Sequence, residues 1–160
     1  MQMWLVSSDD ARLRISADTR KHSSYIDGLL DGIGDAEASV DIVVPFADAF
    51  LLKKMTDFLE HHLEDDIVDE NWRELPPHPL SEWDHQHLCT LNGMQLTLLM
   101  KSYNFLGCQL GLNTVGAMIG YQIMARDERG LAEFFGQSVP LTYSKEQLAA
   151  VERQFREPFR

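Results

Sequence analysis

Residues 102–120, SYNFLGCQLGLNTVGAMIG, are apolar, rich in glycine and almost free of charge. The structure assigned to this stretch decides the predicted fold. A membrane span needs about 20 consecutive apolar residues, but Asn104 and Asn113 interrupt this run and Lys101 precedes it. Its glycines form neither G-x-G-x-x-G nor G-x-x-x-x-G-K-[ST], and no strand pattern leads into them, which argues against a nucleotide-binding loop. Helix is the remaining interpretation.

Helical spacing supports this interpretation, because four apolar side chains fall near one face: Leu110, Val115, Met118 and Ile119. Gly111 and Gly116 lie beside that face. Glycine costs about 1 kcal/mol in a helix interior. Its presence here therefore predicts close approach by another backbone.

The composition suits one domain with a real core, since 44% of the 160 residues are hydrophobic. A formal net charge of -11 repels phosphate backbones, so no nucleic-acid partner is expected. The start, MQMWLVSSDD, lacks the pattern of a secretory signal. Cys89 and Cys108 lack C-x-x-C spacing and lie in apolar stretches, so we expect buried, reduced thiols in an intracellular protein.

Period-two patterning is confined to the first third of the chain. It predicts a hairpin over residues 3–16 and a buried strand over VDIVVPF, residues 40–46. Between them, Thr19 is expected to cap a helix that includes Tyr25 on its inner face and stops at Gly32. A second helix follows the cap Asp48, with an apolar stripe made of Phe50, Leu51, Met55, Phe58 and Leu59.

The rest of the sequence is helical apart from residues 63–82, an acidic stretch with several prolines that predicts a surface loop. Asp84 is a reasonable cap for a helical region that runs almost to residue 120 and is split near Asn92 and Gly107. Short helices are predicted within residues 126–135 and 144–155, the latter with a capping box. The fold class is therefore α+β, a small sheet packed with helices.

Catalytic and metal-binding patterns are weak. His85, His87 and Cys89 stand two apart on a helix and point away from one another, so they cannot converge on one metal ion. The cysteines have no glycine elbow or partner signature. We therefore expect no catalytic residues, no metal and no cofactor. The stripe of the last helix fits either docking on its own core or half of an intermolecular interface.

The order of the motifs resembles the Skp family, the S-phase-kinase-associated adaptors that bridge cullins to F-box proteins. LVSSDDARLRIS is similar to the opening hairpin of that family, and FLLKKMTDFLEHH to its first long helix. An acidic, proline-bearing segment and a Trp-Asp pair follow, here Trp83 and Asp84. SYNFLGCQLGLNTVGAMI, LAEFFGQ and LTYSKEQLAAVERQF resemble the remaining helices, so the resemblance covers almost the whole chain.

This resemblance implies a BTB/POZ-like core over residues 1–120, with an acidic loop over 63–82, and C-terminal F-box-binding helices over 121–160. The implied cullin-binding residues are Val44, Pro45, Phe46, Asn104 and Phe105. The implied F-box-binding residues are Val115, Ile119, Leu131, Phe135, Leu148, Val151 and Phe155. The protein would then be a non-catalytic adaptor of an SCF-type ubiquitin ligase, cytoplasmic and nuclear, with no membrane partner.

Departures from the family leave alternatives open. Phe105 stands where the family usually has tyrosine, and RDERGL lacks the proline of the usual segment. One alternative is a Skp-like subunit that binds F-box proteins outside ubiquitin ligases, in a kinetochore or trafficking assembly. Another is a small enzyme that depends on Cys108 or Cys89. A weak homodimer of the unpartnered chain also remains open.

Overall fold

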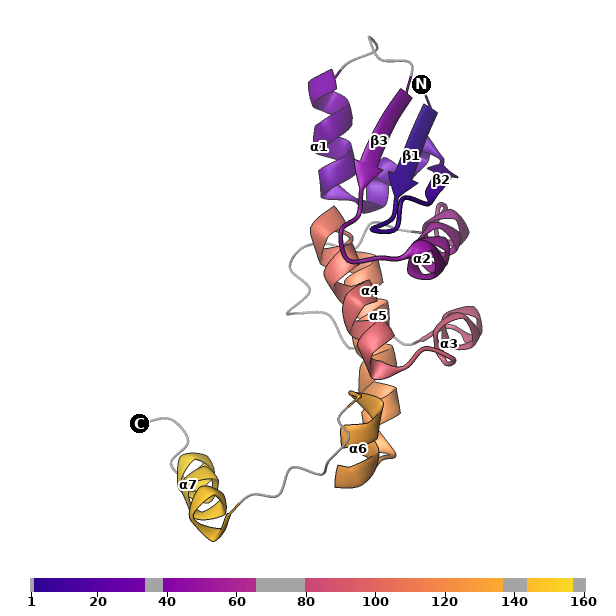
Figure 1. The fold of residues 1–160 in the computed structure, drawn as a ribbon. Coiled ribbons are helices and arrows are strands. Elements are labelled where there is room, and N and C mark those ends of the chain that lie inside the picture. Colours follow the sequence, from indigo (N-terminus) through magenta and orange to yellow (C-terminus); the bar gives the residue numbers. More distant parts are fainter. Residues whose placement is uncertain (1, 34–38, 66–79, 137–143, 157–160) are drawn as a thin grey trace. The chain divides into compact units, whose positions relative to one another are not determined.

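The computed structural model describes residues 2–33, 39–65, 80–136 and 144–156, and it has a mixed α+β architecture (Figure 1). The chain divides into two compact units, Met1–Ala125 and Arg126–Arg160. The first unit contains the sheet and most of the helices. Within the described ranges, no helix combines the length and the apolar character needed to cross a membrane.

The sheet has three strands, β1 (Gln2–Val6), β2 (Arg12–Ile15) and β3 (Ser39–Val43), in the order β2-β1-β3. Strand β1 pairs antiparallel with β2, which confirms the predicted hairpin, and parallel with β3. A parallel pair needs a crossover connection. Helices supply it here, because the segment between β2 and β3 contains the 3-10 helix η1 (Ala17–His22) and α1 (Ser24–Ile33).

Strand β3 is half-exposed, so the prediction of a fully buried strand was wrong. Val40 and Ile42 are buried, whereas Asp41 and Val43 face solvent. Burial alternates along β1 as well as β3, so the difference arises because the sheet is buried on one face and more exposed on the other. On that face Arg12 of β2 pairs with Asp41 at 2.5 Å and stacks over the Trp4 ring at 4.4 Å.

The single helix predicted from Thr19 is two elements. Ser16 caps η1 instead, because its side chain accepts from the Asp18 amide, while the Thr19 side chain is buried and donates to the Ser16 carbonyl at 2.7 Å. Ser23 has extended backbone and separates η1 from α1. Gly32 lies within α1 and does not end it.

Helix α2 (Ala49–His61) begins as predicted, since the Asp48 side chain accepts from the Leu51 amide at 2.8 Å. Most of its apolar stripe is buried, from Leu51 to Leu59. Phe50 is the exception: it is 51% exposed, so its assignment to the buried stripe was wrong. It occupies the first turn, on the side of α2 that faces solvent.

Three helices, α3 (Glu82–Leu88), α4 (Gly93–Leu106) and α5 (Gln109–Met124), confirm the predicted breaks near Asn92 and Gly107. Asn92 caps α4, and Gly107 ends it with a left-handed φ of 61°. The predicted cap Asp84 is corrected to Ser81, three residues earlier, because Asp84 is the reciprocal member of the capping box. Of the predicted acidic loop over 63–82, residues 66–79 lie outside the described ranges.

Helices α4 and α5 lie side by side, and a ring rather than a backbone explains the first glycine of α5 (Figure 1). A Cβ on Gly111 would lie 2.5 Å from the buried ring of Tyr103 in α4. A Cβ on Gly116 would meet nothing within 4 Å. The predicted close approach of another backbone is therefore corrected at both positions.

The second unit contains α6 (Glu128–Phe134) and α7 (Lys145–Arg156), as the sequence predicted. Asp127 caps α6 through the Gly130 amide at 2.8 Å. The predicted capping box of α7 is present: the Ser144 amide donates to Gln147, and the Gln147 amide donates to Ser144. These local interactions set where both helices begin.

Candidate functional site

The corner between β3 and α2 contains three of the expected cullin-binding residues, and they differ in exposure. Val44 is fully buried, and its amide donates to the Val6 carbonyl at 2.8 Å, so it belongs to the core. Pro45 is exposed, and the Phe46 ring is 41% exposed. Only Pro45 and Phe46 of this corner are therefore available at the surface.

The end of α4 lies beside this corner. The ammonium of Lys101 is 6.0 Å from the centre of the Phe46 ring. Phe105 lies one helical turn after Lys101, on the same face of α4. The structure thus brings together residues that are almost 60 positions apart in the sequence, and Asn104 is exposed next to them.

Helix α1 completes this surface with Tyr25. Its ring lies 5.1 Å from that of Phe105 and is 43% exposed, so the assignment of Tyr25 to the inner side of its helix was wrong. We call the set Tyr25, Phe46, Lys101, Asn104 and Phe105 the corner face. Sequence reasoning missed Tyr25 and Lys101, because nothing in a helical period tells which neighbours from other elements lie alongside.

The expected F-box-binding residues fall in both units, and each unit is described by itself. In the first unit Val115 is buried and Ile119 is half-buried, both on α5. In the second unit Leu131 is half-buried, while Phe135 and Leu148 are 41% and 49% exposed. Phe135 packs edge-on against Phe134, with ring centres 5.0 Å apart. The side chains of Val151 and Phe155 lie outside the described residues.

An open groove of about 910 Å³ runs between α3 and α5. It is lined by Leu80, Ser81, Glu82, His85, Gln86, Ala117, Gly120, Tyr121 and Met124. Tyr121 and Met124 are 58% and 87% exposed, and the Tyr121 ring packs edge-on against His85 at 5.1 Å. The groove therefore presents exposed apolar side chains on one wall and polar ones on the other.

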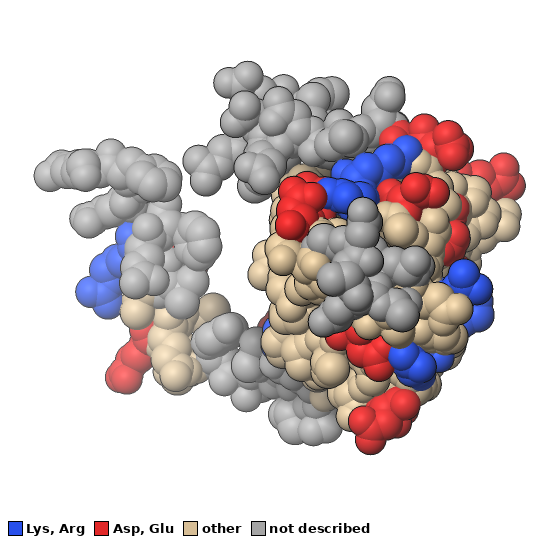
Figure 2. Space-filling view, turned by 90° about the horizontal axis from the view of Figure 1, so that it is seen from above, with Lys and Arg blue, Asp and Glu red and all other residues tan. Residues whose placement is uncertain are grey.

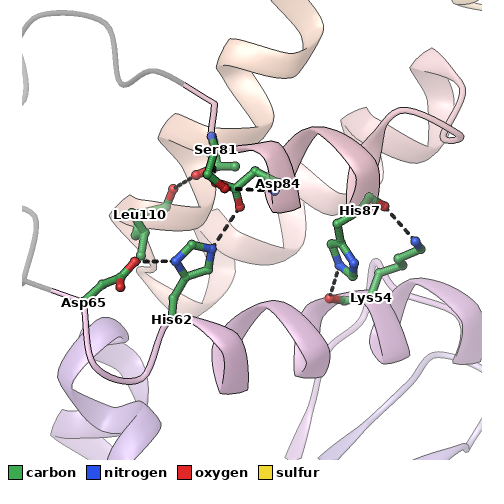
Figure 3. Close-up of polar contacts among 8 residues, drawn as sticks. Lys54, His62, Asp65, Ser81, Asp84, His87 and Leu110 are labelled. Atoms are coloured by element: carbon green, nitrogen blue, oxygen red, sulfur yellow. Dashed lines mark hydrogen bonds and ion pairs between the residues drawn. The ribbon is translucent and has the colours of Figure 1, made fainter.

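A buried polar cluster joins the end of α2 to the start of α3 (Figure 3). The His62 Nε2 atom lies 2.9 Å from Asp84 Oδ1, and Nδ1 contacts Asp65 Oδ2. Ser81 Oγ donates to Asp84 Oδ2 at 2.7 Å. The spacing of Phe58, Leu59 and His62 along α2 is the signal that could have predicted this burial, since it continues the apolar stripe.

Ser81, Asp84 and His62 are the residue types of a hydrolase triad, but their hydrogen bonds connect them in a different order. In a catalytic triad the hydroxyl bonds to the imidazole, which removes its proton. In this cluster the Ser81 hydroxyl bonds to Asp84, and both nitrogens of His62 face carboxylates. His62 therefore has no free nitrogen for the Ser81 proton, and the contacts are structural.

Burial and hydrogen bonding act in opposite directions on the cluster. Burial alone would lower the pKa of His62, but the hydrogen bonds that its ring donates to Asp84 and Asp65 outweigh burial and raise the pKa above its usual 6.5. Burial alone would raise the pKa of Asp84, but its bonds to His62 and Ser81 lower it below its usual range. Both shifts favour the ion pair of His62 with Asp84.

Two more histidines stack on Trp83 beside the cluster. The centre of the His61 ring lies 3.8 Å from that of Trp83, and the centre of the His87 ring lies 4.4 Å from it, both nearly parallel to the indole. His87 also contacts the Lys54 carbonyl at 2.9 Å, while the Lys54 ammonium donates to the His87 carbonyl at 2.7 Å (Figure 3). His87 is therefore a docking residue between α3 and α2, rather than part of a freely solvated helix surface.

The two cysteines differ, so the prediction of two buried thiols was half wrong. Cys108 is fully buried, and burial raises its pKa to about 11. A thiol with so high a pKa makes a poor nucleophile at neutral pH. Cys89 is exposed at the C-cap of α3.

Acidic and basic groups lie among one another on the face of the first unit that Figure 2 shows. Ion pairs form among such groups, for example between Arg20 and both Asp27 and Asp31 at 2.6 Å each. Exposed pairs of this kind contribute little to stability.

No protein-family model matches this chain, and no curated protein matches it at a significant level. The case for a function therefore rests on the residues and contacts described above.

Proposed function

We propose that this protein is a non-catalytic adaptor of the Skp type, with a BTB/POZ-like core and a C-terminal helical extension. It would bridge a cullin scaffold to F-box substrate receptors in an SCF-type ubiquitin ligase. Its action is geometric, since it holds a receptor at a fixed distance from the catalytic arm. The order of sequence motifs suggests this role, and the corner face is the observation that carries it.

The corner face has the composition of a protein-binding surface. The Tyr25 and Phe46 rings are exposed and the Phe105 ring of α4 is half-buried, and one ammonium and one amide lie beside them. Exposed aromatic residues beside a few polar groups are typical of interface centres. Val43 at the end of β3 and Phe50 at the start of α2 are also exposed, at 57% and 51%. A standard interface buries about 800 Å² per partner.

Tyr25 also compensates for the departure at position 105. The family usually has a tyrosine where this chain has Phe105, which removes a hydroxyl from the expected cullin surface. The Tyr25 ring packs 5.1 Å from Phe105 and is 43% exposed. It therefore brings a phenol to the same face, which supports retained cullin binding.

The second partner surface would lie on the exposed apolar residues of the C-terminal helices. Phe135 and Leu148 are its best-described members, at 41% and 49% exposure. The charge of -11 keeps such apolar surface soluble while it awaits a partner. An aromatic anchor such as Phe135 would dominate binding there.

Calorimetric titration of the full chain with a purified cullin and with a purified F-box protein tests both surfaces. Phe46→Ala should weaken cullin binding by about tenfold or more, equal to 1.4 kcal/mol, and leave F-box binding unchanged. Phe135→Ala should do the reverse. Met94→Ala is the matched control, since Met94 is 55% exposed on α4, about 16 Å along the helix from Phe105.

The outcomes separate the alternatives. Binding of the F-box protein without the cullin selects the subunit that serves F-box proteins outside ubiquitin ligases. Binding of neither partner overturns the proposal. Equal effects of Phe46→Ala and Met94→Ala on cullin affinity would remove the corner face from the cullin site.

A further inference from the structure

His62 is held between two carboxylates where water has little access. Its side chain is 7% exposed and that of Asp84 is 1% exposed, whereas Asp65 is 51% exposed at the surface. Figure 3 shows the imidazole pointing one nitrogen at each aspartate. The three residues come from the end of α2, the turn after it and the first turn of α3.

This geometry suits only the protonated ring. A neutral imidazole has one N–H, so it can donate to Asp65 or to Asp84 but not to both. The nitrogen without a proton would then point a lone pair at a carboxylate. The imidazolium donates to both, which makes two charge-assisted hydrogen bonds at a buried position.

Other ionisable side chains also lie near His62. The His61 ring lies 4.9 Å away, edge-on, and His22 of η1 approaches the His62 backbone carbonyl. Burial lowers the pKa of His22, which therefore favours its neutral form. From α4, the buried Tyr103 stays neutral because burial raises its pKa. Among the described residues, Asp65 and Asp84 are the carboxylates that contact this ring.

The cluster controls where α3 begins. Asp84 accepts from His62 with one oxygen and from Ser81 with the other. Ser81 is the cap of α3 and lines the groove between α3 and α5, together with Glu82, His85 and Gln86. A change at His62 is therefore transmitted through Asp84 to the wall of this groove.

We propose that His62, Asp65 and Asp84 form a protonation-dependent latch that holds α3 against α2 and sets the shape of the groove between α3 and α5. With His62 protonated, the latch is closed. When His62 loses its proton, one of the two hydrogen bonds is lost and α3 opens more often. The groove would then respond to pH, whatever partner the protein binds.

The direction of the effect follows from proton linkage. The folded state raises the pKa of His62, so the latch contributes fully below about pH 6.5, the usual value for histidine. Its contribution is lost as the pH rises through the pKa of His62 in the folded protein.

The test is a pH series of the full chain by NMR, from about pH 5.5 to 9. The carbon-bound ring protons report the titration of His62, and amide hydrogen exchange, corrected for its intrinsic pH dependence, reports the opening of α3. We expect His62 to titrate above its usual pKa, and we expect the protection of α3 amides to fall over the same pH range. Protection in α4 should stay constant.

Two variants sharpen the test. His62→Gln cannot become charged, so α3 should be weakly protected at every pH. His61→Gln is the matched control, because the neighbouring ring stacks on Trp83 instead of facing carboxylates, and it should keep the pH dependence. Where His62→Gln does not fold, Asp65→Asn serves, since it removes the exposed carboxylate and should move the transition of α3 to lower pH.

Three results would overturn the latch. The first is α3 protection that does not change between about pH 6 and 8.5 in the unmodified chain. The second is His62 titrating at or below its usual pKa. The third is a pH dependence of α3 protection in Asp65→Asn or His62→Gln that equals that of the unmodified chain.

Discussion

Gly111→Ala tests how α4 and α5 pack, in the segment that organises the chain. Gly111 lies in the first turn of α5, and a Cβ there would come within 2.5 Å of Cγ and Cδ1 of Tyr103. Real Cβ atoms do not approach so closely. Tyr103 cannot swing aside freely, because its ring is fully buried and lies 5.3 Å from that of Phe58.

The magnitude follows from two opposing effects. Alanine in place of glycine gains about 1 kcal/mol in a helix interior and less near its start. Overpacking of a filled core costs about 1–3 kcal/mol. We therefore expect Gly111→Ala to lower the free energy of unfolding by about 1 kcal/mol. In Gly116→Ala, in the same helix, the new Cβ meets nothing within 4 Å. This variant should therefore raise the free energy of unfolding by about 0.5–1 kcal/mol.

Urea denaturation of the two variants measures the difference, which should be about 2 kcal/mol in favour of Gly116→Ala. The same glycine change in a Tyr103→Leu background should cost less, because the ring that the new methyl group meets is gone. The packing argument would be refuted if Gly111→Ala were as stable as the unmodified chain. It would also be refuted if the free energy of unfolding changed in the same direction in both glycine variants.

Two further predictions concern buried groups. The Tyr103 hydroxyl is buried without a hydrogen-bond partner among the described residues, so Tyr103→Phe should leave stability unchanged or raise it by about 1 kcal/mol in urea denaturation. A drop of that size would reveal a partner for the hydroxyl. Cys89 should react with an aromatic disulfide reagent at once, and Cys108 only on unfolding, because Cys108 is buried and its pKa is raised to about 11. Equal rates in native protein would contradict this.

Helix starts and stops were the most predictable features of the fold. The cap Asp48, the break at Asn92 and the left-handed Gly107 each act through the few residues around them, so the sequence contains the whole interaction. Thr19 and Asp84 failed as caps because Ser16 and Ser81, each three residues earlier, offer a hydroxyl at the right position.

The candidate site was only partly predictable. Phe46 and Asn104 were expected to share a surface by resemblance, and the Lys101 contact with Phe46 places the two segments side by side. Tyr25 was assigned to the wrong side of its helix, since a helical period identifies an apolar stripe but not whether another element covers it. The groove between α3 and α5 had no sequence signal, because its walls come from separate helices.

The amino-acid sequence alone determined the α+β class, the hairpin and the ends of most helices, because short-range periodicity and capping encode them. The tertiary structure alone decided which polar groups are buried and which apolar groups are exposed. His62 and Asp84 became a buried pair, and Phe50 and Cys89 became exposed. The reason is that solvent access depends on neighbours distant in sequence, whereas a side chain's chemistry does not.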